Sequence, residues 1–300
     1  MVPLPSVLLH HWTAERERML QCPAPADHSG SVTCNVLRRR HGDTSQTADR
    51  VVEELPVALV FNGISHAVMM ATPIDLDVFA LGFALSEGIV DCASDVFDIE
   101  TVYAAGSAEV QLTVSQQAFM ALKGKRRALA GRSGCGVCGV ESIELLDLHP
   151  ARIQYAGAAD DISAEAVERA ARELPAHQVL MRETGGIHAA AWCTREGEIA
   201  EVFEDVGRHN ALDKLIGQLA RQKADTRRGF VFLSSRASYE LVRKAARVQI
   251  QMIATISAPT SLAIDIACQA GIRLLGFCRG SGFVEYGSPS APAMGVAGSQ

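Results

Sequence analysis

Two cysteines separated by two residues are the strongest chemical signal in this sequence. Cys135 and Cys138 lie in the stretch Gly134-Cys-Gly-Val-Cys-Gly139, whose glycines leave the sulfur atoms uncovered and let backbone N–H groups converge on them. The cations that precede the pair are Lys123, Lys125, Arg126, Arg127 and Arg132. Because nearby cations favour thiolate over thiol, Cys135 is a candidate nucleophile.

A CxxC pair serves several kinds of chemistry, and the rest of the chain helps to choose among them. A structural zinc site needs further soft ligands, but no second CxxC and no closely spaced histidine pair follows. A zinc deaminase needs His-x-Glu, which is absent from the sequence. A thioredoxin-type dithiol opens a helix in a βαβ unit, whereas this pair follows a basic, glycine-rich stretch. A thiolate that attacks another protein's persulfide fits best, with a zinc half-site and a redox disulfide as alternatives.

The first half of the chain supplies a small domain before this pair. Residues 1–30 predict an irregular N-terminal arm, and residues 31–122 predict a small α+β domain. Within it, Asn62-Gly63 is a hairpin signal between the strand candidates at 56–61 and 64–71, and apolar residues at helical spacing predict a helix over 74–86. Residues 123–140, which carry the CxxC pair, predict a flexible basic loop.

The second half, residues 141–286, predicts an α/β cofactor-binding domain, followed by a C-terminal tail at 287–300. Apolar strands alternate with amphipathic helices, the pattern of a sheet covered on both faces. The expected strands are 188–194, 199–204, 229–233, 252–257, 273–278 and 283–286, and the expected helices are 163–174, 209–222, 239–249 and 261–270. The fold class is therefore α/β, or α+β overall, and its chemistry belongs at the strand-to-helix loops.

Polar residues occupy several of these loops. Ser235 and Arg236 follow one strand, and Ser257 and Thr260 follow the next. Hydroxyls and unpaired helix N–H groups at such junctions can bind an anion, although an ordinary helix N-cap is the simpler reading of each hydroxyl taken singly. The helix that precedes both strands has Arg208 and His209 at its start, and we predict these as further contacts with an anionic ligand.

Composition limits the partners. The chain has 300 residues, and its 34 acidic and 28 basic residues give a net charge of −6, which offers no global attraction to nucleic acid or to an anionic membrane. The longest uncharged run, residues 55–74, is interrupted by prolines and by Asn-Gly, so it does not predict a membrane-spanning helix. The N-terminus lacks the features of a signal peptide, and a cytoplasmic protein is the expectation.

Five stretches in order along the chain resemble a known family. The first is Cys135-Gly-Val-Cys-Gly139. The other four follow it along the chain: Thr184-Gly-Gly-Ile-His188, Glu204-Asp-Val-Gly-Arg-His-Asn-Ala-Leu-Asp-Lys214, Ser234-Ser-Arg-Ala-Ser-Tyr-Glu240 and Ser257-Ala-Pro-Thr-Ser261. Together they are similar to the signature set of the formate dehydrogenase accessory sulfurtransferase family. The chain departs from many relatives at Ser235, where they carry glycine, so a turn that needs a positive φ would be strained here.

The resemblance implies a sulfur carrier. It would take sulfur from a cysteine desulfurase onto Cys135 as a persulfide, with Cys138 in support, and pass it to the molybdenum cofactor that formate dehydrogenase needs for activity. The family binds this cofactor, bis(molybdopterin guanine dinucleotide), as a client. The segment expected near the guanine consists of Phe277, Cys278, Arg279, Gly280, Ser281 and Gly282.

The resemblance also bears on architecture and assembly. It implies that the larger C-terminal domain is a three-layer domain like that of cytidine deaminase, without the zinc ligands, and that the protein is a homodimer. No permanently bound metal is predicted. The alternative function is a chaperone that binds the cofactor while its CxxC pair is structural or redox-active.

Overall fold

The computed structural model describes residues 28–128, 148, 150–280 and 282–287. Most of the predicted N-terminal arm, both cysteines of the CxxC pair, Ser281 and nearly all of the predicted tail therefore lie outside the described residues. No helix in the described ranges is long and apolar enough to cross a membrane.

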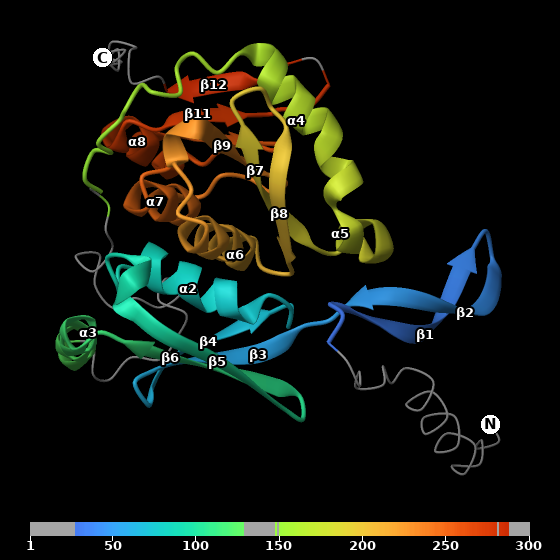
Figure 1. Ribbon diagram of the computed structural model, residues 1–300. Coiled ribbons are helices and arrows are strands. Elements are labelled where there is room, and N and C mark those ends of the chain that lie inside the picture. The colour runs from blue at the N-terminus through green and yellow to red at the C-terminus, as the bar shows by residue number, and fades with distance from the viewer. Residues whose placement is uncertain (1–27, 129–147, 149, 281, 288–300) are drawn as a thin grey trace, which may run out of the picture.

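The N-terminal half contains two separate β units, an antiparallel hairpin and a mixed sheet in which two of the strands are parallel. Strands β1 (Ser31–Arg40) and β2 (Asp43–Val52) form a two-stranded hairpin that projects away from the rest of the molecule (Figure 1). The second unit is a four-stranded sheet in the order β4-β3-β6-β5. Its strands are β3 (Leu55–Phe61), β4 (Ile64–Ala71), β5 (Val96–Ala104) and β6 (Ser107–Val114). Strands β3 and β6 are the parallel pair. Asn62 and Gly63 both have positive φ, 45° and 79°, which confirms the predicted hairpin turn.

Helix α2 (Leu76–Ser86) is the central element of the molecule. All of its residues except Asp77 are buried, because it lies between the four-stranded sheet and the helices of the second half (Figure 1). A helix that is apolar on every side is stable only in such a position. A short 3-10 turn, η1 (Ala93–Asp95), leads into β5.

Helix α3 (Gln116–Ala128) extends into the stretch 123–140 that the sequence predicts as a flexible basic loop. Its backbone remains helical through Ala128, so residues 123–128 are not part of a loop. Lysine, arginine and alanine are good helix formers, and a run of them prolongs the helix even where no apolar stripe marks it.

The second half has a six-stranded sheet in the order β12-β11-β10-β9-β7-β8. The strands are β7 (His188–Thr194), β8 (Ile199–Asp205), β9 (Gly229–Leu233), β10 (Met252–Thr255), β11 (Arg273–Gly276) and β12 (Val284–Gly287). The helices are α4 (Ala164–His177), α5 (Val179–Thr184), α6 (Arg208–Arg221), α7 (Tyr239–Arg247) and α8 (Ser261–Ala270), with a 3-10 turn η3 (Thr226–Arg228). Every strand expected here from the sequence is present.

Helices cover both faces of this sheet, as the pattern predicted. Helix α4 packs on one face, where Val167, Ala170 and Leu174 join a cluster with Phe230 and Phe232. Helices α6, α7 and α8 cover the other face, and their core is continuous with α2 and the four-stranded sheet. The two halves therefore share one hydrophobic core. Helix α5 of the second half was not expected from the sequence.

Candidate functional site

One edge of the six-stranded sheet gathers the predicted cofactor residues. Strands β9, β10 and β11 are parallel, β7 is antiparallel to β9, and β8 is antiparallel to β7. The carboxyl ends of β8, β9, β10 and β11 and the amino end of β7 therefore meet at one edge, which we call the strand-end edge. Such an edge is where ligands bind in α/β sheets.

Hydrogen bonds join the loops of the strand-end edge to one another. The N–H of Ser234 donates to the carbonyl of Ala189 (3.0 Å), and the hydroxyl of Ser234 accepts from the N–H of Ala189 (2.8 Å). The N–H of Phe277 donates to the carbonyl of Ser257 (3.3 Å), and that of Thr260 to the carbonyl of Ala237 (3.0 Å). The loops after β9, β10 and β11 thus form one connected surface.

Phe277 has an unusual backbone at this edge. Its φ is 54°, in the left-handed region that side chains other than glycine rarely adopt, and its ring is half-buried. The guanidinium of Arg279 lies 5.6 Å from the centre of the ring, within the range of a cation–π contact. A strained aromatic residue with a cation beside it is suited to stacking on a nucleotide base.

The neighbouring Cys278 faces the other way. Its side chain is 1% exposed and belongs to the apolar cluster under α4, and burial raises the pKa of its thiol to about 11. Its side chain therefore does not reach the strand-end edge, and only its backbone is available to a ligand there. A Cβ added to Gly280 or Gly282 would have no other described residue within 4 Å, leaving aside its chain neighbours.

The three hydroxyl residues predicted as ligand contacts, Ser235, Ser257 and Thr260, differ in whether they already bond to the protein's own backbone. Thr260 accepts a hydrogen bond from the N–H of Ala263 (3.3 Å), so it is an ordinary N-cap of α8. Ser235 is buried and donates to the carbonyl of Arg236 (3.1 Å). Ser235 is not among the residues with positive φ, so serine in place of glycine causes no strain in this turn. Ser257 is exposed.

In the motif from Glu204 to Lys214, several polar side chains bond to other parts of the fold. The carboxylate of Glu204 accepts from the N–H groups of Leu180 and Met181, both at 2.8 Å, and so caps α5. Asp205, which has no exposed surface, pairs with buried Lys214 at 2.8 Å. These residues join α5 and β8 to α6.

Arg208 and His209 are the members of this motif that remain for a ligand. Gly207 is the N-cap of α6, so these two residues open the helix at the strand-end edge. The Nε atom of Arg208 is buried and has no hydrogen-bond partner in the described part of the chain. A buried donor without a partner is costly, and a bound anion would satisfy it.

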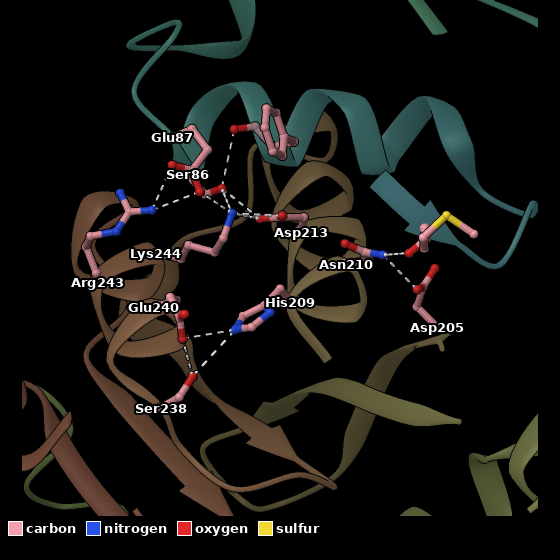
Figure 2. A network of polar contacts seen from close by, with 12 residues as sticks. Ser86, Glu87, Asp205, His209, Asn210, Asp213, Ser238, Glu240, Arg243 and Lys244 are labelled. Carbon is pink, nitrogen blue, oxygen red and sulfur yellow. Dashed lines mark hydrogen bonds and ion pairs between the residues drawn. The ribbon is translucent and has the colours of Figure 1, made fainter. Parts of the chain in front are cut away.

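His209 contacts two side chains of α7 that the sequence reading did not assign. Its Nε2 lies 3.2 Å from Oε2 of Glu240 and 3.5 Å from Oγ of Ser238, and the hydroxyl of Ser238 donates to the same Oε2 at 2.8 Å (Figure 2). The hydrogen bond from His209, helped by Ser238, lowers the pKa of Glu240 to about 2. Both partners meet one nitrogen, so this is not the arrangement of a catalytic triad, which uses both ring nitrogens. The sequence signal for the pair is the Ser-x-Glu spacing at the start of α7.

The strand-end edge is electropositive. Arg208, Arg236 and Arg279 form no ion pair with any carboxylate among the residues that the structure describes. His188, at the amino end of β7, has its pKa lowered by burial and by the charges of Arg208 and His209. Cations spread along an edge that also carries a half-buried aromatic ring are suited to an elongated anionic ligand with an aromatic base.

A second polar cluster lies between α2, α6 and α7, away from this edge. The ammonium of Lys244 lies 2.9 Å from Asp213, 2.9 Å from the hydroxyl of Ser86 and 2.7 Å from Glu87 (Figure 2). Arg243 also pairs with Glu87 at 2.7 Å. Burial alone would raise the pKa of Glu87, but Lys244 and Arg243 lower it to about 2. Since all charges are paired, this cluster holds the halves of the molecule together.

The described ranges contain no group of three or more histidine, cysteine or acidic residues that could hold a metal ion. The predicted catalytic residues Cys135 and Cys138 lie outside these ranges. The structure thus places Arg208, Arg236, Ser257, Phe277 and Arg279 along the strand-end edge, whereas the side chain of Cys278 lies away from it.

Comparison with known proteins gives a consistent result. Residues 52–291 match the model of the FdhD/NarQ family. The chain is 67% identical over 257 residues to the sulfur carrier protein FdhD of Burkholderia mallei, covering 84% of this chain and 94% of that protein. It is 49% identical over 265 residues to the protein of the same name from Cupriavidus necator, covering 88% and 90%.

A solved structure has the same fold. A formate dehydrogenase accessory protein from Desulfotalea psychrophila matches with a TM-score of 0.67 and 22% identity, over 87% of this chain and 98% of that one. The family model, the relatives and this fold agree with the resemblance seen in the five sequence motifs. The chain therefore belongs to the FdhD/NarQ family.

Proposed function

We propose that this protein is a sulfur carrier and sulfurtransferase that serves formate dehydrogenase. It takes sulfur from the persulfide of a cysteine desulfurase and delivers it to bis(molybdopterin guanine dinucleotide), the molybdenum cofactor of the dehydrogenase. The name carried by its relatives, sulfur carrier protein FdhD, supports the first part. The observation that supports the second is the strand-end edge, which carries Phe277 with Arg279 beside it at one end and Arg208 at the other, both arginines without an ion pair in the described part of the chain.

The acceptance step needs a thiolate, and Cys135 is the residue proposed to supply it. Its sulfur attacks the terminal sulfur of the donor persulfide, the donor S–S bond breaks, and the donor cysteine leaves as a thiolate. Cys135 then carries the persulfide. The basic residues before Cys135 favour its ionised form, and Cys138 acts in support.

The strand-end edge fits the nucleotide ends of the cofactor. Phe277 offers an aromatic face for guanine, and Arg279 stands beside it as a cation for phosphate. The buried Nε of Arg208 has no hydrogen-bond partner among the described residues, and a phosphate oxygen would satisfy it. Arg236 and Ser257, both exposed, follow β9 and β10 and so lie along the edge between Phe277 and Arg208.

Intact-mass measurement tests the carrier step. The full chain is incubated with a cysteine desulfurase and cysteine, and the wild type is expected to gain the mass of one sulfur atom. Cys135→Ala should not gain it, and Cys138→Ala is the matched control. A gain of the same size in Cys135→Ala would overturn the assignment of the carrier cysteine.

Complementation separates this function from a cofactor-binding chaperone. Cells whose only copy carries Cys135→Ala are expected to lack formate dehydrogenase activity. Retained activity, together with stoichiometric zinc that is lost in the double cysteine variant, would favour the chaperone. Retained activity of Cys138→Ala would argue against a redox disulfide. A homodimer and a cytoplasmic location remain predictions of the sequence, and size-exclusion chromatography with light scattering tests the first.

A further inference from the structure

Thr72 lies between β4 and α2, has no exposed surface and belongs to none of the five sequence motifs. Each of its polar atoms bonds to the second half of the molecule. Its N–H donates to Oδ2 of Asp205 (3.1 Å), its hydroxyl accepts from the N–H of Val206 (3.0 Å), and its carbonyl accepts from the ammonium of Lys214 (3.1 Å). These partners belong to the end of β8, to the turn after it and to α6, so one residue of the N-terminal half holds this turn in place.

The carboxylate of Asp205 is bonded at both oxygens. Its Oδ2 accepts from Thr72 and pairs with Lys214 at 2.8 Å. Its Oδ1 accepts from the N–H of Gly207 (2.8 Å) and from the side-chain amide of Asn210 (3.0 Å). The amide of Asn210 also donates to a backbone carbonyl of β4 at 2.8 Å (Figure 2). A buried carboxylate with donors on both oxygens is held in one orientation, and the turn bonded to it is held as well.

This turn leads directly into Arg208. The N–H groups of Val206 and Gly207 are both bonded, the first to Thr72 and the second to Asp205, and Gly207 is the N-cap of α6. The guanidinium of Arg208 carries the buried Nε that has no hydrogen-bond partner among the described residues. A guanidinium binds phosphate in a fixed geometry, so the strength of the contact depends on how the backbone before it is held.

We infer that Thr72 is a positioning residue for the strand-end edge, because with Asp205 it holds the turn that presents Arg208 to the phosphate of a nucleotide. The inference rests on the proposed function, since it assumes that the nucleotide end of the cofactor binds at this edge. It extends the ligand site beyond the second half, because the end of β4 supports a contact that α6 makes. A group that orients a ligand-binding side chain changes the affinity without touching the ligand.

Calorimetry with GDP, the end group of the proposed cofactor, tests the inference in the full chain. Thr72→Val keeps the shape of the side chain but leaves the N–H of Val206 without its acceptor, and it is expected to weaken GDP binding by about 3- to 10-fold. Thr72→Ser keeps the hydroxyl and should bind GDP as the wild type does. Thr72→Ala removes the hydroxyl without placing a methyl group against that N–H, and it replaces Thr72→Val if the latter does not fold.

Ser86→Ala is the matched control for the loss of a buried hydroxyl between the two halves. The hydroxyl of Ser86 donates to Asp213 (2.7 Å) and accepts from Lys244 (2.9 Å), in the polar cluster that lies away from the strand-end edge. Ser86→Ala should lower the free energy of unfolding, as Thr72→Val does, but should bind GDP as the wild type does. Equal weakening of GDP binding in the two variants would be a general effect of lost stability and would overturn the positioning role.

A double-mutant cycle tests whether Thr72 acts through Arg208. Arg208→Gln should weaken GDP binding by about 10- to 100-fold, the effect of losing a hydrogen bond to a charged group. In the Arg208→Gln background, Thr72→Val should cause no further loss of affinity. In the background of Arg279→Gln, at the other end of the edge, it should cause its full loss. Equal losses in both backgrounds would overturn the coupling between Thr72 and Arg208.

The outcomes separate this inference from the function on which it rests. Wild-type affinity in both Thr72→Val and Thr72→Ala overturns the positioning role and leaves the nucleotide site in place. A loss in Thr72→Ser equal to that in Thr72→Val assigns the effect to the methyl group and also overturns the role of the hydroxyl. Failure of the wild type to bind GDP overturns the nucleotide site and, with it, the inference.

Discussion

Gly82 of α2 and Gly217 of α6 face each other where the two helices cross. A Cβ on Gly82 would lie 1.7 Å from the carbonyl oxygen of Asp213, and one on Gly217 would lie 1.9 Å from that of Val78. The two helix backbones are therefore in direct contact. This crossing joins the half that carries the four-stranded sheet to the half that carries the strand-end edge.

Substitution of Gly82 is expected to separate these helices. In Gly82→Ala, the methyl group meets backbone that cannot rotate away, so we expect a loss of about 3 kcal/mol or more in the free energy of unfolding. Urea denaturation measures it. Gly124→Ala in α3 is the control, since no atom of the described residues outside its own helix lies within 4 Å of its Cβ position, and it should stabilise the protein by about 0.5–1 kcal/mol. Equal effects of the two variants would contradict the close crossing.

Removal of the Lys244 ammonium should lower the free energy of unfolding more than removal of an exposed charge does. In Lys244→Met, buried Asp213 loses its ion-pair partner, and a buried pair broken on one side costs about 3–5 kcal/mol. Adding Asp213→Asn should recover part of the loss, because no charge is then left unpaired. A double variant as unstable as the sum of the two single variants would show that the residues are not coupled.

Glu87 predicts a specific acid sensitivity. Its folded pKa of about 2 lies below the unfolded value, so its contribution to stability is complete above about pH 5 and is lost as pH falls towards 2. The contribution is about 3 kcal/mol at neutral pH. Glu87→Gln should therefore flatten the decline of stability between pH 5 and pH 2, measured by urea denaturation at each pH. An unchanged decline would contradict the ion pairs with Lys244 and Arg243.

Two substitutions of Phe277 should weaken ligand binding alike but differ in the stability of the fold. Phe277→Gly and Phe277→Ala both remove the ring, and each is expected to weaken GDP binding by about 5- to 100-fold, the effect of losing one base stack. Glycine also relieves the positive φ, so Phe277→Gly should be more stable than Phe277→Ala by about 1 kcal/mol. Calorimetry and thermal unfolding measure the two effects. Undiminished binding by both variants would contradict the stacking role.

Local patterns in the chain were enough to predict most of the elements. The strand β9 and the helix α8 have the predicted bounds, because apolar runs and N-cap residues mark their ends locally. The order of strands and helices also predicted that loops of the second half would share one edge, since parallel strands joined by helices end on the same side. The family followed from motifs in these loops.

Other features depend on contacts between distant residues. The sequence offers no sign that Cys278 points into the cluster under α4, or that Glu240 meets His209. These outcomes depend on which neighbour each side chain meets. The same holds for Gly82 and Gly217, which are 135 positions apart in the chain and would each be read alone as a weak point in a helix.

The motif from Glu204 to Lys214 illustrates the division most clearly. The sequence by itself determined that its polar residues surround the start of a helix at a strand end, because hydrophobic periodicity is a local property. Only the tertiary structure decided that Glu204, Asp205 and Lys214 are used within the fold. It also decided that His209 meets Glu240 and that the Nε of Arg208 finds no partner in the ranges that the structure describes. The reason is physical: a buried polar group must find a partner, and that partner can lie anywhere in the chain.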